Sequence, residues 1–357
     1  MKIIKSVRKK DVNFMGDNFR LIIDKIFDPA KHYALEEAMM RLMDENDSFP
    51  NTLRLRRVKR SVLIGFLENP YDTVNVDIAL KNRVKIVRRH NLGGTVYQDL
   101  GSFMFTCLYR NGTFLSKLSE EETYNEFSNL IILFLKKFGI EGKRRGLNDV
   151  VVNDKKIFGS SFTKIGDSIS YTGTILVDMD LEFLSKVLKF IKPKFSDKNF
   201  KSLKDALTTI SIELNRKVKI KEAYKNFIDA FKEKFNVSLF KGKITKKEKK
   251  LMFELYNKKY KNWEWTFGEE KEFEEIYTKK IRSGLIILRG NFQEKIEKIK
   301  IYGDFLIAER EKIEELENNL NMRSYDEAIN IIKSLNLNSE LQNGLIEIIN
   351  EIKNKRG

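Results

Sequence analysis

Two arginines and a pair of glycines form the first cluster of residues that could do chemistry. Arg88 and Arg89 end a short β-type run, and Gly93 and Gly94 follow in the stretch RRHNLGGTVYQDLG, 88–101. Glycines beside a strand let backbone N–H groups approach a phosphate or carboxylate, and arginine offers a planar donor fork to the same oxygens. Taken alone, the stretch fits a Gly-Gly hairpin turn beside two solvated arginines better than an anion site.

A second cluster lies in KKIFGSSF, 155–162. Because alternate strand residues share a face, Lys156 is expected on the same face as Phe158 and Ser160. A lysine on the inward face of a sheet is costly unless it meets an anion. Alternation does not decide whether Lys155 or Lys156 faces inward, and two solvated lysines are the simpler interpretation. Cys107 lies in the apolar run SFMFTCLY and is expected to be a core thiol rather than a nucleophile.

These residues need strands and helices to position them. Apolar spacing and turn residues predict β-type runs at 53–57, 61–66, 84–89, 94–98, 102–109, 148–162 and 168–177. Helical spacing is found at 33–46, 121–138, 180–191 (with Pro193 just beyond) and 219–235. The run at 148–162 resembles a hairpin that turns at Asn153-Asp154, because both residue types tolerate turn geometry. Grouped strands with short connections predict an α+β fold with largely antiparallel pairing.

The length of 357 residues suggests two domains, with a boundary near 242–245. Beyond it, a charged helix is expected at 246–260, β-type runs at 282–292 and 295–305, and helices at 308–320, 324–335 and 340–352. This would be a small α+β module.

Composition narrows the classes of function. One cysteine excludes an internal disulfide framework, and two histidines argue against a multi-histidine metal site. The sequence has no apolar run of membrane-spanning length, and residues 1–14 lack the apolar stretch of a signal peptide, so a cytoplasmic protein is expected. The net charge of +16 is spread along the chain, with the densest basic patches at 241–250 and 279–282. Without an aromatic-interleaved basic stripe, nucleic-acid binding is not favoured.

The order of five blocks resembles lipoate–protein ligases of the biotin/lipoate ligase fold. The blocks are DPAKHYALEEAMMRLM, TLRLRRVKRSVLIGFLEN, VKIVRRHNLGGTVYQDLGS, GLNDVVVNDKKIFGSSF and SYTGTILVDMDLEFLSKVL. In the tail, KNWEWTFG and EKIKIYGDF are similar to the family's accessory domain. The resemblance implies a catalytic acyl-adenylate-forming domain at 1–244 and a C-terminal accessory domain at 245–357.

This resemblance also implies an activity and its residues. The family activates lipoate or octanoate with ATP as acyl-AMP, with Mg²⁺ on the phosphates, and passes the acyl group to a lysine of a carrier domain. Lys156 matches the lysine that stabilises the moving charge. The implied nucleotide-binding residues are Arg89, Gly93, Gly94, Thr95, Val96, Tyr97, Asn148, Asp149 and Lys156. The implied acyl-substrate residues are Arg89, Gly94, Lys156, Phe158, Gly173 and Thr174, and Leu63, Ile64 and Val87 could line the acyl slot or belong to the core.

Several positions depart from the family pattern. Leu92 replaces the first of three glycines, Gln98 a histidine, Ser102 an asparagine, Leu147 an arginine, and Tyr171-Thr172 a histidine pair. Leucine disfavours positive φ, so a change in the loop backbone is expected at Leu92.

The resemblance implies a monomer whose protein partner is a lipoyl carrier domain, in the acyltransferase subunit of a 2-oxoacid dehydrogenase or in the glycine-cleavage carrier protein. Two alternatives stay open: an ATP-independent transferase using a cysteine, and a degenerate, non-catalytic relative.

Overall fold

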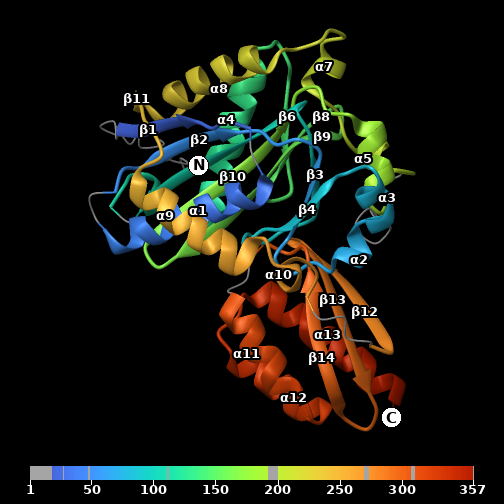
Figure 1. Ribbon diagram of the computed structural model, residues 1–357. Helices are drawn as coiled ribbons and strands as arrows, with labels where there is room; N and C mark the ends of the chain where they lie inside the picture. The colour runs from blue at the N-terminus through green and yellow to red at the C-terminus, as the bar shows by residue number, and fades with distance from the viewer. Residues whose placement is uncertain are drawn as a thin grey trace, which may run out of the picture.

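The computed structural model describes residues 18–26, 28–46, 49–110, 112–191, 200–268, 273–306 and 310–356, without the side chains of 310 and 311. Pro193 and the expected helix start at 308 lie outside these residues. Figure 1 shows a large α/β body built from most of the chain and a smaller lower body built from the C-terminal strands and helices.

An eight-stranded sheet forms the frame of the large body. Its order is β11 (Ser238–Lys241), β1 (Asn18–Ile23), β2 (Thr52–Arg56), β6 (Ser102–Arg110), β10 (Ser168–Leu176), β9 (Lys155–Ile165), β8 (Asp149–Val152) and β7 (Lys143–Arg145). The pairs from β2 to β7 are antiparallel, while β1 runs parallel to both of its neighbours. The predicted α+β fold with largely antiparallel pairing is confirmed.

Helices cover both faces of this sheet. On one face, α4 (Glu120–Lys136) and α8 (Ile220–Phe235) pack over an aromatic core in which the Phe105 ring lies 4.7 Å from Phe227 and 6.0 Å from Phe158. On the other face lies α1 (Pro29–Glu45), which begins at an Asp28 cap. Helices can pack on both faces because successive strand residues point to opposite sides, and apolar residues occur on each side.

A three-stranded sheet beside α1 carries the glycine loop. Its order is β4 (Lys85–Arg88), β3 (Ser61–Ile64) and β5 (Val96–Gln98), so β3 lies between the two strands that flank the Gly-Gly pair. β4 runs parallel to β3, and β5 runs antiparallel to it. The hairpin-turn interpretation of 88–101 is therefore wrong, because β4 and β5 do not pair and residues 89–95 form a crossover loop instead.

Short elements complete the rim of the large body. They are α2 (Pro70–Thr73), α3 (Val76–Lys81), a 3₁₀ turn at Leu115–Lys117, α5 (Leu181–Val187), α6 (Leu203–Ala206) and α7 (Ile210–Glu213). The helix expected at 180–191 thus ends early, at Val187.

The lower body is a three-stranded antiparallel sheet covered by helices. β12 (Glu275–Ile281) pairs with β13 (Gly284–Phe292), which pairs with β14 (Ile296–Gly303); the helices are α11 (Arg310–Leu320), α12 (Tyr325–Ser334) and α13 (Ser339–Arg356). β12 was not predicted, and Arg282 lies in the turn before β13 rather than in a strand. Among the described residues, no helix is long and apolar enough to cross a membrane.

The segment between the two bodies packs on α1. α9 (Lys246–Leu255) continues into a π-helical turn at Tyr256–Tyr260, and Met252, Leu255 and Tyr260 share a buried cluster with α1. α10 (Trp263–Phe267) then leads to the lower body. The domain division at 244/245 stays a prediction.

Candidate active site

A cavity of 490 Å³ gathers residues from both bodies. Its wall includes the glycine loop, the β8–β9 hairpin, part of β10, the region of α5 and α6, and the turn between β12 and β13. The expected site residues that line it are Arg89, Gly93, Gly94, Thr95, Val96, Tyr97, Asn148, Asp149, Lys156, Phe158 and Thr174. Segments far apart in sequence thus meet around one space, as the resemblance implies.

Gly173 is an expected residue that does not line this cavity. A Cβ placed on Gly173 would lie 2.3 Å from the Phe158 ring and 2.7 Å from the Phe105 ring. The glycine therefore lets the aromatic core pack against β10. Leu63, Ile64 and Val87 are fully or almost fully buried in the hydrophobic clusters and are also outside the cavity lining, so the core alternative holds for them.

Arg89 shapes the glycine loop from inside. Its guanidinium donates to the carbonyl oxygens of Asn91 at 3.2 Å, Leu92 at 2.5 Å and Gly94 at 2.7 Å. Burial lowers the pKa of Arg89, and its Nε has no hydrogen-bond partner among the described residues. The loop carbonyls thus occupy most of the donors that sequence reasoning assigned to phosphate or the acyl end.

Arg88, the other arginine of the pair, points the opposite way. It donates to the carbonyl oxygens of Trp265 at 2.9 Å and Phe66 at 2.7 Å, and the Trp265 indole N–H donates back to the Arg88 carbonyl at 2.8 Å. Arg88 therefore fastens the strand before the loop to α10. The paired arginines are both structural donors, and neither is a solvated side chain.

The loop fits closely against the end of β3. A Cβ on Gly65 would lie 1.7 Å from the Gly93 carbonyl oxygen. Gly93 itself has φ of +92°, which a side-chain-bearing residue would adopt only with strain. The Thr95 N–H donates to the Glu68 carboxylate, which fixes the exit of the loop.

Leu92 does not take a positive φ, and the expected change in the loop backbone stays a prediction. Its side chain is almost fully buried and joins the hydrophobic cluster of the lower body. The leucine at this position therefore ties the loop to the C-terminal sheet and helices.

Lys156 forms the charged centre of the cavity. Its Nζ lies 2.6 Å from the Asp149 Oδ1, and Arg145 lies 3.6 Å from the other carboxylate oxygen. The hairpin turn at Asn153-Asp154 is confirmed, with φ of +50° and +60°.

Lys156 lies against Gly159 because the β8–β9 register shifts between Val150 and Val151. A Cβ on Gly159 would meet the Lys156 Nζ at 2.6 Å. The expected common face of Lys156 with Phe158 and Ser160 is therefore wrong: a bulge interrupts the alternation. Asn148 secures the hairpin by donating to the Ser160 carbonyl at 2.8 Å.

Gln98 and Ser102, two of the positions that depart from the family pattern, form a hydrogen bond with each other. Gln98 Nε2 donates to Thr174 Oγ1 at 2.9 Å, and Ser102 Oγ donates to Gln98 Oε1 at 2.7 Å. Tyr171 lies on the aromatic face, stacked 3.9 Å from Phe127, and donates to Ser160 Oγ at 2.7 Å. The polar groups at these three positions therefore have hydrogen-bond partners within the fold.

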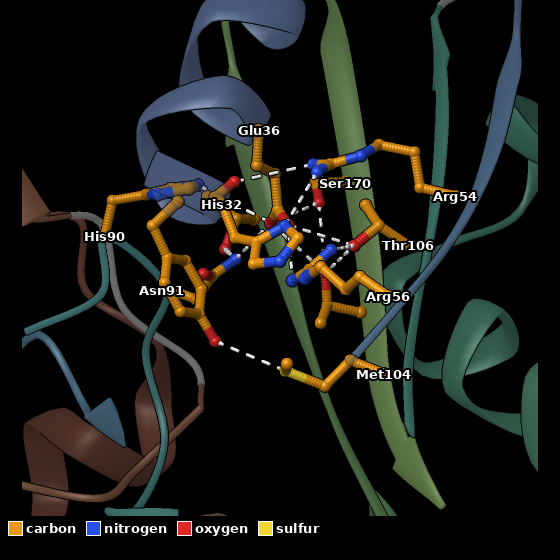
Figure 2. A network of polar contacts seen from close by, with 12 residues as sticks. His32, Glu36, Arg54, Arg56, His90, Asn91, Met104, Thr106 and Ser170 are labelled. Atoms are coloured by element: carbon orange, nitrogen blue, oxygen red, sulfur yellow. Dashed lines mark hydrogen bonds and ion pairs between the residues drawn. The ribbon is translucent and has the colours of Figure 1, made fainter. Parts of the chain in front are cut away.

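A buried polar network under α1 was missed by sequence reasoning (Figure 2). Glu36 accepts from Thr106 at 2.9 Å, Ser170 at 3.1 Å and Thr172 at 3.2 Å, and its carboxylate lies 2.7 Å from Arg56. Burial alone would raise the pKa of Glu36, but Arg56, His90 and Arg54 hold it at about 2. The arginines Arg54 and Arg56, which alternate with leucines in a buried strand, were the available signal.

His90 joins this network to the C-terminal segment. Its Nδ1 lies 2.8 Å from the Tyr260 hydroxyl, which in turn donates to Glu37 at 2.5 Å. The Tyr260 hydroxyl has one proton, so Nδ1 of His90 is the donor in this contact. Tyr33, Asn91 and Thr172 face both the network and the cavity, so the network forms part of the wall behind the site.

Comparison with known proteins identifies this arrangement. The family described as "Lipoyl protein ligase A/B catalytic domain" matches residues 28–232, more than half of the chain. The chain belongs to this family. Its matched region contains the glycine loop, the β8–β9 hairpin and Lys156.

Related proteins extend the likeness beyond the matched region. The chain is 27% identical over 328 residues to lipoate-protein ligase LplJ of Bacillus subtilis, covering 89% of this chain and 95% of that protein. A structure of a bi-partite lipoate protein ligase and its E2 lipoyl domain from Thermoplasma acidophilum is 28% identical, with a TM-score of 0.63, over 72% of this chain and 99% of that one. P. falciparum LipL1 in complex with lipoate shares the fold, with 24% identity and a TM-score of 0.74 over 94% of this chain and 99% of that one.

Proposed function

We propose that this protein is an ATP-dependent lipoate–protein ligase, which activates lipoate or octanoate as acyl-AMP and transfers the acyl group to a carrier lysine. The observation that carries the proposal is one cavity lined both by Lys156, which lies beside Asp149, and by the glycine loop. Family membership and the names of the relatives support the same activity.

In the first step, a carboxylate oxygen of the acid attacks the α-phosphorus of ATP. An O–P bond forms, the bond to the β-phosphate oxygen breaks, and pyrophosphate leaves. Two anions must approach each other, so a cation between them lowers the barrier. We assign this role to Lys156, whose ammonium would exchange the Asp149 carboxylate for the reacting oxygens.

The backbone of the glycine loop holds the nucleotide in this proposal. Gly93 and Gly94 offer N–H groups, Thr95 lines the same cavity, and Arg89 keeps the loop in shape through its carbonyl contacts. Asp149 fits a Mg²⁺ ligand, because Mg²⁺ is usually bound by one or two carboxylates together with substrate phosphates and water. Mg²⁺ would neutralise phosphate charge when bound.

In the second step, the neutral ε-amine of a carrier lysine attacks the acyl carbon. An amide bond forms, AMP leaves with the electron pair of the acyl–oxygen bond, and the amine loses a proton. The partner would be a lipoyl carrier domain, the class of protein named together with the Thermoplasma relative.

Mass spectrometry of a lipoyl-domain acceptor tests the whole proposal. Incubation with the protein, ATP, Mg²⁺ and lipoate should add one lipoyl group, and octanoate should add an octanoyl group. No added mass with either acid, in the presence of a folded acceptor, would overturn it.

An ATP-independent transferase would need a cysteine nucleophile. Cys107 is fully buried in β6, and burial raises its pKa well above the ordinary value, so the thiolate is disfavoured. Acyl transfer that persists without ATP, and is lost in Cys107→Ala, would instead favour that alternative.

A further inference from the structure

The turn between β12 and β13 is part of the cavity wall, although it belongs to the lower body. Lys280, Arg282, Ser283 and Gly284 line the cavity together with Asp304 and Leu306. The basic patch at 279–282, noted in the sequence as one of the densest, therefore reaches the same space as Lys156.

Contacts within the lower body hold this turn in place. The Leu306 N–H donates to the Ser283 carbonyl at 3.3 Å, and the Leu285 N–H donates to the Asp304 carboxylate at 2.6 Å. Leu306 is almost fully buried and joins the hydrophobic cluster of the large body. Its Cδ2 lies 3.0 Å from the place a Cβ on Gly93 would take. Leu306 thus connects the turn to the glycine loop, because it donates to Ser283 and its side chain lies beside Gly93.

Arg282 is held by a contact that a ligand could replace. Its Nη2 lies 2.9 Å from Glu121 at the start of α4, and the two side chains are 66% and 59% exposed. Ion pairs as exposed as this one contribute little free energy. A polyanion in the cavity can therefore recruit the guanidinium at low cost.

Four other basic residues line the cavity. Arg89 donates to loop carbonyls, Lys156 and Arg145 share Asp149, and Lys189 donates to the Tyr71 carbonyl at 2.6 Å. In the proposed reaction Lys156 serves the α-phosphate. The β- and γ-phosphates also need cationic donors, and Lys280 at the end of β12 and Arg282 in the turn line the same cavity.

We propose that Lys280 and Arg282 bind the β- and γ-phosphates of ATP, so that the lower body supplies part of the nucleotide site. Arg282 exchanges Glu121 for phosphate oxygens, which match its donor fork. The inference rests on the proposed function for the identity of the nucleotide. It adds two phosphate-binding residues, both carried by the lower body, to the proposed nucleotide site.

The two neighbouring lysines of β12 provide a matched control. Alternate strand residues face opposite sides, and Lys279 forms an ion pair with Glu347 of α13, behind the sheet. Lys280 lines the cavity in front of it. Lys279→Met therefore removes the same charge from the same strand without removing a cavity cation.

The experiment compares the double variant Lys280→Met/Arg282→Met with Lys279→Met. Binding of ATP and of AMP is measured by calorimetry, and acyl-adenylate formation by ATP–pyrophosphate exchange. Transfer from synthetic lipoyl-AMP to an acceptor domain follows the second step alone. The double variant should bind ATP at least about tenfold more weakly, with AMP binding and transfer from lipoyl-AMP nearly unchanged, because each lost charge-assisted contact serves only the outer phosphates.

Two single variants sharpen the test. Arg282→Lys should recover part of the ATP affinity, and Glu121→Gln should leave it equal or improve it, since Arg282 is then released from its carboxylate partner. Lys279→Met should match the parent protein. Thermal unfolding midpoints show that each variant is folded.

Wild-type ATP affinity in the double variant would overturn the inference, as would an equal loss of AMP binding, ATP binding and transfer. A parent protein that shows no pyrophosphate exchange would refute the proposed ligase activity, whereas the ratio of ATP to AMP affinity would still decide whether the turn binds phosphates.

Discussion

Lys156 and Lys155 are adjacent in sequence but have different surroundings. Lys156 is 31% exposed and paired with Asp149 inside the cavity, while Lys155 is exposed to solvent. Lys156→Met should lower the rate of acyl-adenylate formation by about 100-fold or more, since it removes the charge that screens two anions. Lys155→Met should retain the parent rate. Pyrophosphate exchange measures both, and an active Lys156→Met protein would remove this lysine from the proposed mechanism.

Arg56 and Glu36 form a fully buried ion pair at the centre of the network in Figure 2. Arg56→Met should reduce the free energy of unfolding by about 3–5 kcal/mol, because it leaves the Glu36 carboxylate without its main counter-charge. Adding Glu36→Gln in the same chain should recover part of that loss. Urea unfolding of the two single variants and the double variant measures the coupling. Strictly additive losses would show that the two charges do not stabilise each other.

At the scale of elements, the glycine loop depends on its close fit to the end of β3. Gly65→Ala would place a methyl group 1.7 Å from the Gly93 carbonyl oxygen, so the loop must move. A displacement of about 1 Å at a reacting centre can cost on the order of 100-fold, and we expect a fall of this size in kcat/KM for ATP. The thermal midpoint separates a moved loop from an unfolded protein. Unchanged ATP kinetics would mean that this loop does not hold the nucleotide.

Local patterns predicted local elements well. The turn at Asn153-Asp154 and the helix now seen as Glu120–Lys136 follow from residue types that act over a few positions. The order β4-β3-β5 could not be predicted in the same way, because strand pairing is decided by contacts between distant segments. The bulge beside Lys156 is also set by pairing with β8, and alternation within the strand gave the wrong face.

The candidate site also combines residues that sequence motifs predict with residues whose roles depend on contacts between distant segments. Motif order placed the glycine loop, Asn148, Asp149 and Lys156, and the structure brings them to one cavity. The roles of Arg54 and Arg56 were not predicted, because their carboxylate partners, Asp24 after β1 and Glu36 in α1, meet them only in three dimensions. The contribution of the β12–β13 turn depends on how the lower body packs, which no local pattern records.

Across the whole molecule, buried and partly buried polar contacts connect the C-terminal segments to the large body. Tyr260 and Lys259 meet Glu37 of α1, and Arg289 pairs with Asp72 at the start of α2. Leu67 and Leu92 enter the hydrophobic cluster of the lower body. The position of the lower body, and hence of the β12–β13 turn, is therefore tied to the glycine loop, which forms part of the cavity wall.

The two buried histidines make the stability of the molecule sensitive to acid. Burial lowers the pKa of His32 and of His90 to about 4, despite the neighbouring carboxylates. Unfolded, both would titrate near 6.5. Their contribution to the free energy of unfolding is fully present above pH 6.5 and is lost as pH falls toward 4, because the unfolded chain then binds more protons. Each histidine can account for roughly 3 kcal/mol over this range.

Glu120 acts in the opposite direction over an overlapping range. Burial raises its pKa to about 7, so the folded state takes up a proton there more readily than the unfolded chain. Urea unfolding at pH 7.5, 6, 5 and 4.5 should therefore show a net fall in stability in the parent protein. His32→Gln and His90→Gln should each flatten that fall, and Glu120→Gln should steepen it, since it removes the opposing proton uptake. Curves with the same slope in the parent and in both histidine variants would mean that the histidines titrate alike in the folded and unfolded chain, and their burial would then have no part in the acid response.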